Sequence, residues 1–261
     1  MKITQIRNAT VLIETAELGI LVDPMFAPKG AIPSLKYATR SRRRNPLVEL
    51  PENFNQLKSK VTCCLITHCQ KGHFDHLDRA AVKWLRDNDI LVYCSTQDAK
   101  FLSAKGLNIE VLDPEITNPI FGGAIRLIPC THGKGFIGSM MAHGYGYFLE
   151  LPGEPSLYLA GDTILTQSVE EFIKNEQPDI TLIPAGGARM DLGGEIIMGL
   201  EEAVSVGELA NGKVIANHLE ALDHCPVSRI SIFSEVRRRC WEDRYFIPQD
   251  GESLSFKQAV C

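Results

Sequence analysis

The sequence lacks any long uninterrupted apolar run and any recognisable export signal. No window approaches the ~18 consecutive apolar residues that a membrane-spanning helix requires. Residues 1–7 show neither the apolar stretch nor the small-residue cleavage site of a signal peptide. From these absences we expect a cytoplasmic protein that does not contact membranes.

The chain also lacks the excess of positive charge that is typical of general nucleic-acid binders. It contains 32 acidic and 27 basic side chains, which gives a formal net charge of −5. This balance argues against nucleic acid as the partner. Two basic runs, Arg40–Arg44 and Arg237–Arg239, are expected to be solvated faces or helix ends. The first run could also meet an anionic group of a small-molecule substrate.

Two signatures of cysteine and serine chemistry are missing. The eight cysteines include no Cys-x-x-Cys pair, so we expect free thiols in a reducing compartment. Cys63 and Cys64 are adjacent in a predicted strand, where neighbouring side chains face opposite ways. The sequence also has no Gly-x-Ser-x-Gly turn, which argues against a serine nucleophile of the type that such turns present.

The length and the apolar content of 44% suit one large α/β domain spanning residues 1–261. Residues 10–15 and 20–23 predict a hairpin that opens an antiparallel edge, and residues 25–60 predict a long loop or lid. The alternation of predicted strands and helices favours two mixed sheets packed together, with helices outside. Further strands are expected at 61–66, 90–93, 108–112, 125–129, 145–150, 156–160, 180–184 and 213–216, and helices at 78–87, 97–105, 169–175, 200–210 and 228–239.

The densest group of candidate ligands directly follows the predicted strand at 61–66. It comprises His68, His73, Asp75 and His76, and it holds three of the seven histidines of the chain. Imidazole nitrogen together with carboxylate oxygen suits zinc, manganese, iron or cobalt. Four such groups at one strand end can hold two metals close together. Asp75 could bind a metal directly or orient a neighbouring histidine.

Three more candidates each follow an apolar strand. They are His132, Asp162 and His218, and strand ends are where functional groups collect on a rigid scaffold. Taken singly, they could be a loop histidine, a helix-capping aspartate and a surface histidine. His224 is the rival of His218 and is expected to support a ligand or to face the substrate. His143 is expected to be structural.

In combination these motifs resemble the metallo-β-lactamase superfamily, and within it the branch of L-ascorbate-6-phosphate lactonase-like hydrolases. The resemblance covers essentially the whole chain. It implies an αββα four-layer sandwich, with two mixed β-sheets and helices outside, and a dinuclear metal site at one edge of the sheets. The motifs that carry it are, in order, Asp23-Pro24, the 67–76 cluster, His132, Gly161-Asp162-Thr163 and His218.

The resemblance also implies a division of the ligands between two metals. The family has one residue between its first two histidines, whereas four separate His68 from His73 here. His68 remains a ligand only if these residues bulge outwards, which Gly72 would ease because glycine tolerates positive φ. The implied ligands are His68, His73 and His132 for the first metal, Asp75, His76 and His218 for the second, and Asp162 as a bridge.

The function implied is that of a metal-dependent hydrolase, in which a metal-bound hydroxide attacks a small ester, lactone or phosphoester. Zinc is the expected metal, with manganese and iron as alternatives. Asp75 is expected to shuttle the proton to the leaving group, and His224 to act at the substrate. Two other interpretations remain: a nuclease or phosphodiesterase, and a non-hydrolytic metal-binding protein of the same fold. The substrate and the oligomeric state, a homo-oligomer included, stay open.

Overall fold

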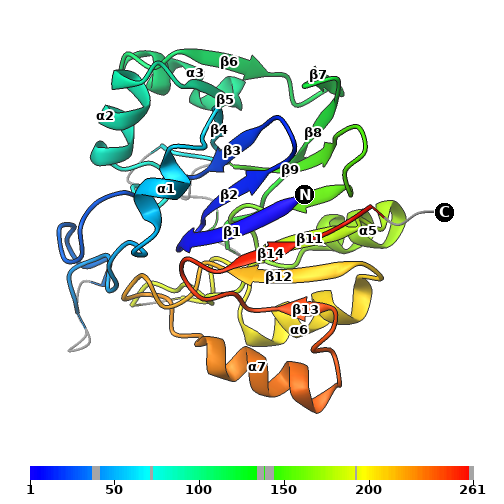
Figure 1. The fold of residues 1–261 in the computed structure, drawn as a ribbon. Helices are drawn as coiled ribbons and strands as arrows, with labels where there is room; N and C mark the ends of the chain where they lie inside the picture. The colour runs from blue at the N-terminus through cyan, green and yellow to red at the C-terminus, as the bar shows by residue number, and fades with distance from the viewer. Residues whose placement is uncertain (37–41, 71–72, 134–137, 139–143, 192, 259–261) are drawn as a thin grey trace.

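Two seven-stranded sheets pack face to face, and helices cover their outer surfaces (Figure 1). The computed structural model describes residues 1–36, 42–70, 73–133, 138, 144–191 and 193–258. This arrangement confirms the predicted αββα sandwich of two mixed sheets. Within the described residues, no helix combines the length and the apolar character needed to cross a membrane.

The first sheet is antiparallel on one side and parallel on the other. β1, β2 and β3 pair antiparallel, and β3 then runs parallel to β4, as β4 does to β5 and β5 to β6. Its strands, in spatial order, are β14 (Ser253–Ser255), β1 (Lys2–Arg7), β2 (Thr10–Glu14), β3 (Gly19–Val22), β4 (Cys63–Leu65), β5 (Leu91–Ser95) and β6 (Ile109–Leu112).

The predicted hairpin exists, but the expectation that it opens an edge of the sheet is wrong. β2 and β3 form it, and β1 covers its outer side. β14 then pairs with β1 and places Leu254 opposite Ile3. Because β14 comes from the far end of the chain, no local pattern in the sequence predicts this pairing. The result is a hairpin inside the sheet, where it is held on both sides.

The second sheet contributes three of the four strand ends from which the predicted site residues leave, those of β8, β10 and β12, and one strand separates each from the next. β8 and β9 pair antiparallel, as do β9 and β10, while β10, β11, β12 and β13 are parallel. Its strands, in spatial order, are β13 (Tyr245–Phe246), β12 (Lys213–Asn217), β11 (Ile180–Pro184), β10 (Leu157–Leu159), β9 (Tyr145–Glu150), β8 (Gly123–Pro129) and β7 (Asn118–Ile120).

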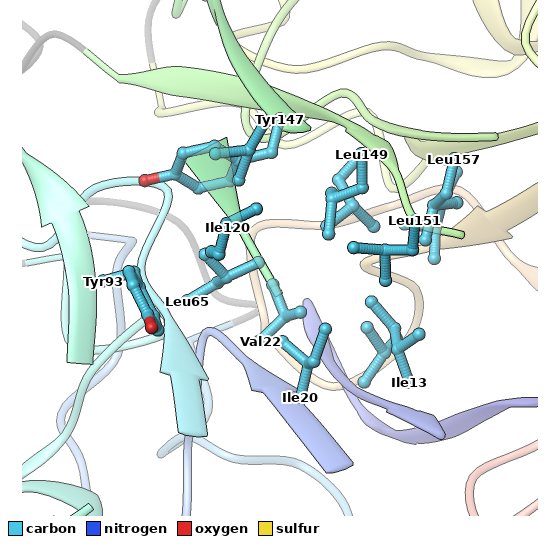
Figure 2. Packing of buried hydrophobic residues seen from close by; sticks show 14 of the residues in the cluster. Ile13, Ile20, Val22, Leu65, Tyr93, Ile120, Tyr147, Leu149, Leu151 and Leu157 are labelled. Carbon is cyan, nitrogen blue, oxygen red and sulfur yellow. The ribbon is translucent and has the colours of Figure 1, made fainter. Parts of the chain in front are cut away.

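The main core lies between the two sheets. Figure 2 shows Ile13 and Val22 from the first sheet packing with side chains of the second sheet that include Leu149. Burying one such side chain completely contributes roughly 1.5–3 kcal/mol. Cys63 belongs to this inner core, whereas Cys64 lies in the cluster on the outer face, which confirms their predicted opposite orientation. The seven cysteines among the described residues are free.

The helices sit where their apolar faces can be buried against the outer surfaces of the sheets. Leu85 and Leu102 from α2 and α3 pack on the first sheet, and Ile173 and Ile232 from α5 and α7 pack on the second. The region expected to be a long loop contains the short helix α1. The helices are α1 (Phe54–Lys58), α2 (Arg79–Asp87), α3 (Thr96–Ser103), α5 (Gln167–Glu176), α6 (Leu200–Leu209) and α7 (Arg229–Arg238).

Candidate metal centre

The predicted ligands meet at one end of the sandwich, in the loops that follow β4, β8, β10 and β12. Each loop leaves a strand that is fixed by pairing, so the side chains start from rigid positions. They form two groups, and within each group one ligand atom per residue lies within 4.8 Å of all the others. The groups are His68, His73 and His132, and Asp75, His76, Asp162 and His218.

This grouping matches the division that the resemblance implies for two metals. All seven side chains are buried, so water cannot easily satisfy their polar atoms. The structure therefore brings together every ligand that the sequence proposes. That they bind metal remains a prediction.

The first group shows that the longer spacing does not remove His68. Its Nε2 lies 3.1 Å from Nδ1 of His73, and the two ring centroids are 4.3 Å apart. The ring of His132 lies 5.6 Å from that of His68 and 5.1 Å from that of His73. Gly72, to which a helpful bulge was assigned, lies outside the described residues. The three imidazoles converge despite the longer spacing between His68 and His73.

Asp162 lies between the two groups. Its Oδ2 is 3.1 Å from Nε2 of His76 and 3.5 Å from Nε2 of His218. The same oxygen is 3.6 Å from Nε2 of His132, which belongs to the other group. Asp75 completes the second group with Oδ2 3.4 Å from Nε2 of His218. A carboxylate in this place is positioned to contact two ions at once.

Asp23 orients His76, one of the ligands of the second group. Its carboxylate accepts hydrogen bonds from Nδ1 of His76 at 2.9 Å and from the backbone N and Oγ1 of Thr67 at 2.8 and 2.6 Å. Because Nδ1 of His76 donates, Nε2 carries the free lone pair that a metal requires. In the sequence, Asp23 stands out only as part of the Asp23-Pro24 motif. Its position at the end of β3, directly before Pro24, is the sequence feature that could have identified it as a site residue.

Other polar atoms fix the remaining imidazoles in the same way. Nδ1 of His132 donates to the carbonyl oxygen of Ile196 at 2.7 Å, and Nδ1 of His68 lies 3.2 Å from Oγ1 of Thr67. Nδ1 of His218 lies 3.6 Å from Sγ of Cys225. In each case Nε2 is left to face the ligand group. Nothing in the sequence identified these partners: Ile196 comes from a loop distant from His132, and Cys225 lies seven residues after His218 without a motif that marks it.

His218 adopts a backbone conformation that its residue type rarely takes. Its φ is +57°, in the left-handed region, and its backbone N donates to the carbonyl oxygen of Asn8 at 3.0 Å. Non-glycine residues are uncommon in this region, and they cluster at sites where the surrounding structure imposes the conformation. The contact with β1–β2 therefore sets the direction in which this imidazole points.

Burial lowers the pKa of all three imidazoles of the first group, that of His68 well below its usual value and that of His73 to about 4. In the second group burial alone would lower the pKa of His76 and of His218, but Asp162 outweighs it and raises both well above the usual value. Burial alone would raise the pKa of Asp162, but His76 and His218 outweigh it and hold that pKa well below the usual range. Neutral imidazole and ionised carboxylate are the forms that bind metal.

The residues fit divalent metal ions. Nε2 of His76 is buried and has no hydrogen-bond partner among the described residues, although Oδ2 of Asp162 is 3.1 Å away. Two ligand atoms that approach closely without a good hydrogen bond are expected where both point at a shared ion. The mixed nitrogen and oxygen donor set also suits zinc, manganese or iron.

His224 lies beside the centre but in neither ligand group. The structure buries it, with 5% of its surface exposed, and its carbonyl oxygen accepts from the backbone N of Arg189. Its Nδ1 is 4.0 Å from Sγ of Cys225. Burial alone would raise the pKa of Cys225, but His224 and His218 lower it to about 7. His143 lies outside the described residues.

Comparisons with known proteins show the family to which this chain belongs. A family model described as a beta-lactamase superfamily domain matches residues 2–217. The chain is also 34% identical to UPF0173 protein YddR of Bacillus subtilis (strain 168), over 98% of this chain and all of that relative. The chain belongs to the metallo-β-lactamase superfamily. Within that superfamily it is a member of the UPF0173 family.

Two further relatives of this superfamily member are informative. One is a UPF0173 metal-dependent hydrolase of Koribacter versatilis (strain Ellin345), 28% identical over 71% of this chain and 72% of the relative. The other is the crystal structure of an isothiocyanate hydrolase from Delia radicum gut bacteria. It has a TM-score of 0.88 and 32% identity, and it covers 98% of this chain and all of that one. These relatives confirm the predicted class, a metal-dependent hydrolase of this superfamily.

Proposed function

We propose that this protein is a dinuclear metal-dependent hydrolase of a small electrophilic molecule. The observation that carries the proposal is the position of Asp162, whose Oδ2 lies within 3.6 Å of imidazole nitrogens from both ligand groups. One shared carboxylate between two sets of ligands is the arrangement expected for two ions held close together.

The proposed roles follow from the two groups. His68, His73 and His132 would hold one ion, Asp75, His76 and His218 the other, and Asp162 both. Zinc is the first candidate, with manganese or iron as alternatives. Divalent ions held in this way lower the pKa of coordinated water towards neutrality and stabilise negative charge that develops on the substrate.

The chain itself contributes positioning and proton transfer. Asp23, Thr67 and the carbonyl oxygen of Ile196 hold the imidazoles in fixed tautomers, so the ligands need not reorganise. Asp75 is the proposed proton carrier. Burial alone would raise its pKa, but His76 and His218 keep that pKa far below the usual value, so its carboxylate is ionised. His224 is proposed to act at the substrate.

Two substrate classes have support. The motif resemblance to lactonase-like hydrolases supports a small lactone, ester or phosphoester. The isothiocyanate hydrolase, similar over the full length, favours a second candidate, an isothiocyanate. In that reaction water adds across the carbon–nitrogen double bond, and cleavage of the carbon–nitrogen bond then releases a primary amine and carbonyl sulfide. We further propose that the protein acts without a nucleic-acid or membrane partner.

A reconstitution experiment tests the function. The protein is treated with chelator, reloaded separately with zinc, manganese or iron, and assayed on a lactone, a carboxylic ester, a phosphodiester and benzyl isothiocyanate. We expect chelator to abolish hydrolysis and one metal to restore it, with about two ions bound per chain. Asp162→Asn should abolish the restored activity, whereas the surface control Lys174→Ala should not. Full activity after complete metal removal would contradict the proposal.

A further inference from the structure

A cavity lies outside the metal centre, between α2 and α3. Its volume is about 330 Å³, which falls within the range of small-molecule pockets. Cys69 and His73 form one end, so the cavity reaches the ring of one proposed metal ligand. None of the other proposed ligands among the described residues lines it. It is therefore a separate feature from the centre where the ligands converge.

The walls of the cavity are largely apolar. Leu77 is buried, while the aromatic and aliphatic side chains around it are half-buried and accessible to an occupant. An apolar body of one or two rings would remove these surfaces from water, which favours binding. The apolar lining residues are Phe74, Leu77, Val82 and Phe101.

Four cations surround these apolar walls. One carboxylate, that of Asp78, also lines the cavity, but it accepts hydrogen bonds from the backbone N atoms of Ala27 and Ala81 and caps α2. The lining therefore carries an excess of positive charge within a chain whose net charge is −5. The cations are Arg79, Lys83, Arg86 and Lys105.

The acidic partners of these cations do not neutralise all of the positive charge around the cavity. Lys83 forms an ion pair with Asp87, and a guanidinium nitrogen of Arg86 lies 3.6 Å from the same carboxylate. One carboxylate thus serves two cations. Nζ of Lys105 lies 4.3 Å from the ring centroid of Phe101, so an apolar wall and a cation already sit side by side.

We propose that this cavity binds a small organic anion, in which an apolar body carries a carboxylate, sulfonate or phosphate group. The body packs between Phe74, Val82 and Phe101, and the anionic group pairs with Arg79 and Lys105 at the rim. The combination of apolar walls with unbalanced cations selects against both neutral apolar molecules and free inorganic anions. The site stands independently of the hydrolytic reaction.

The test uses 1-anilinonaphthalene-8-sulfonate, an apolar double ring with one sulfonate whose fluorescence rises on burial. Metal-loaded full-length protein is titrated with it at low salt. N-phenyl-1-naphthylamine, which lacks the sulfonate, and sodium sulfate, which lacks the rings, are the comparison ligands. We expect saturable binding of one sulfonate probe per chain and at least tenfold weaker binding of either comparison ligand.

Matched charge reversals locate the site. Lys105→Glu and Arg79→Glu should each weaken the sulfonate probe at least fivefold, while Lys100→Glu should leave its affinity unchanged. Lys100 is exposed on α3, five residues before Lys105, and does not line the cavity, so it controls for overall charge. Phe233→Ser removes part of the rival apolar surface on α7, where Phe233 is 48% exposed. It should have no effect.

Each contrary outcome overturns the proposal. Equal binding by Lys105→Glu and Lys100→Glu would mean that the cavity cations do not contact the probe. Loss of binding in Phe233→Ser would place the probe on α7. Equal binding of the neutral amine would mean that the site does not recognise an anion. Thermal unfolding of every variant confirms that the comparison is made between folded proteins.

Discussion

His76 and Asp23 are joined by a hydrogen bond of 2.9 Å in which Nδ1 of the imidazole donates to the buried carboxylate. The bond ties a proposed metal ligand in the turn after β4 to the end of β3, so the neighbouring strand fixes the direction of the ring. Carboxylate–histidine pairs of this kind raise the basicity of the ligand and hold its tautomer.

Asp23→Asn should therefore weaken metal binding without removing a ligand. We expect about 10–100-fold lower metal affinity, measured by competition with a chromophoric chelator. Asp179→Asn is the matched control, because Asp179 likewise accepts from both the backbone N and the hydroxyl of one residue, Ser156, but lies away from the centre. An equal loss of affinity in both variants would show a general effect of the substitution rather than a role for Asp23.

Asp162→Ala should loosen both ions at once, since its carboxylate lies between the two ligand groups. We expect the metal content to fall well below two per chain and hydrolysis to fall by several orders of magnitude. The measurement is metal analysis after reconstitution, together with turnover on the best substrate. Near-normal metal content and rate in this variant would reduce Asp162 to a residue of the turn after β10.

His218 and His224 should behave differently although both are buried near the centre. His218→Ala should lose one ion, because its Nε2 faces Asp75 and Asp162. His224→Ala should retain both ions and lose about 10–100-fold or less in turnover. Metal counting on the two variants side by side distinguishes them. The reverse pattern would mean that the last ligand has been assigned to the wrong histidine.

Asp223 should stabilise the long loop that precedes α1. Its carboxylate accepts from the backbone N of Leu35 and of Arg43 and from Nδ2 of Asn45. Asp223→Ala leaves these donors unpaired, and we expect a loss of about 1–3 kcal/mol in the free energy of unfolding, measured with urea. Metal-free wild-type and variant proteins should be compared, so that metal binding does not contribute to the difference.

The same group predicts a pH dependence. Burial alone would raise the pKa of Asp223, but its hydrogen bonds, first among them that from Ser34, lower it below the ordinary value. The stabilisation is thus present above the unfolded-state pKa of about 3.9 and is lost as the pH falls through the folded-state pKa. Urea titrations between neutral and acid pH should show a smaller decline in Asp223→Ala than in wild type.

The sequence predicted those structural features that functional residues or burial mark with a local pattern. Alternating apolar residues predicted most strands, and the opposite faces of Cys63 and Cys64 followed from the pleat alone. The ligand clusters after strands predicted which side chains would meet, because strand ends are fixed by the sheet. His68 illustrates the limit of this reasoning: its spacing from His73 departs from the family, and only the folded structure places its ring in the group.

What the sequence did not reveal depends on contacts between distant segments. β14 pairs with β1 across almost the whole chain, and three residues of no special composition form it. The carbonyl oxygen of Ile196 supports the imidazole of His132, which comes from another loop. A carbonyl oxygen is present at every residue, so no side-chain pattern marks the one that is used.

The left-handed backbone of His218 implies a local conflict between foldability and function at this position. An imidazole is needed there, yet glycine would adopt the same backbone conformation more readily. His218→Gly should unfold at a higher denaturant concentration than His218→Ala, although both lack the imidazole. In engineering for thermostability, glycine at this position would therefore be favoured by any selection that measures folding without measuring hydrolysis.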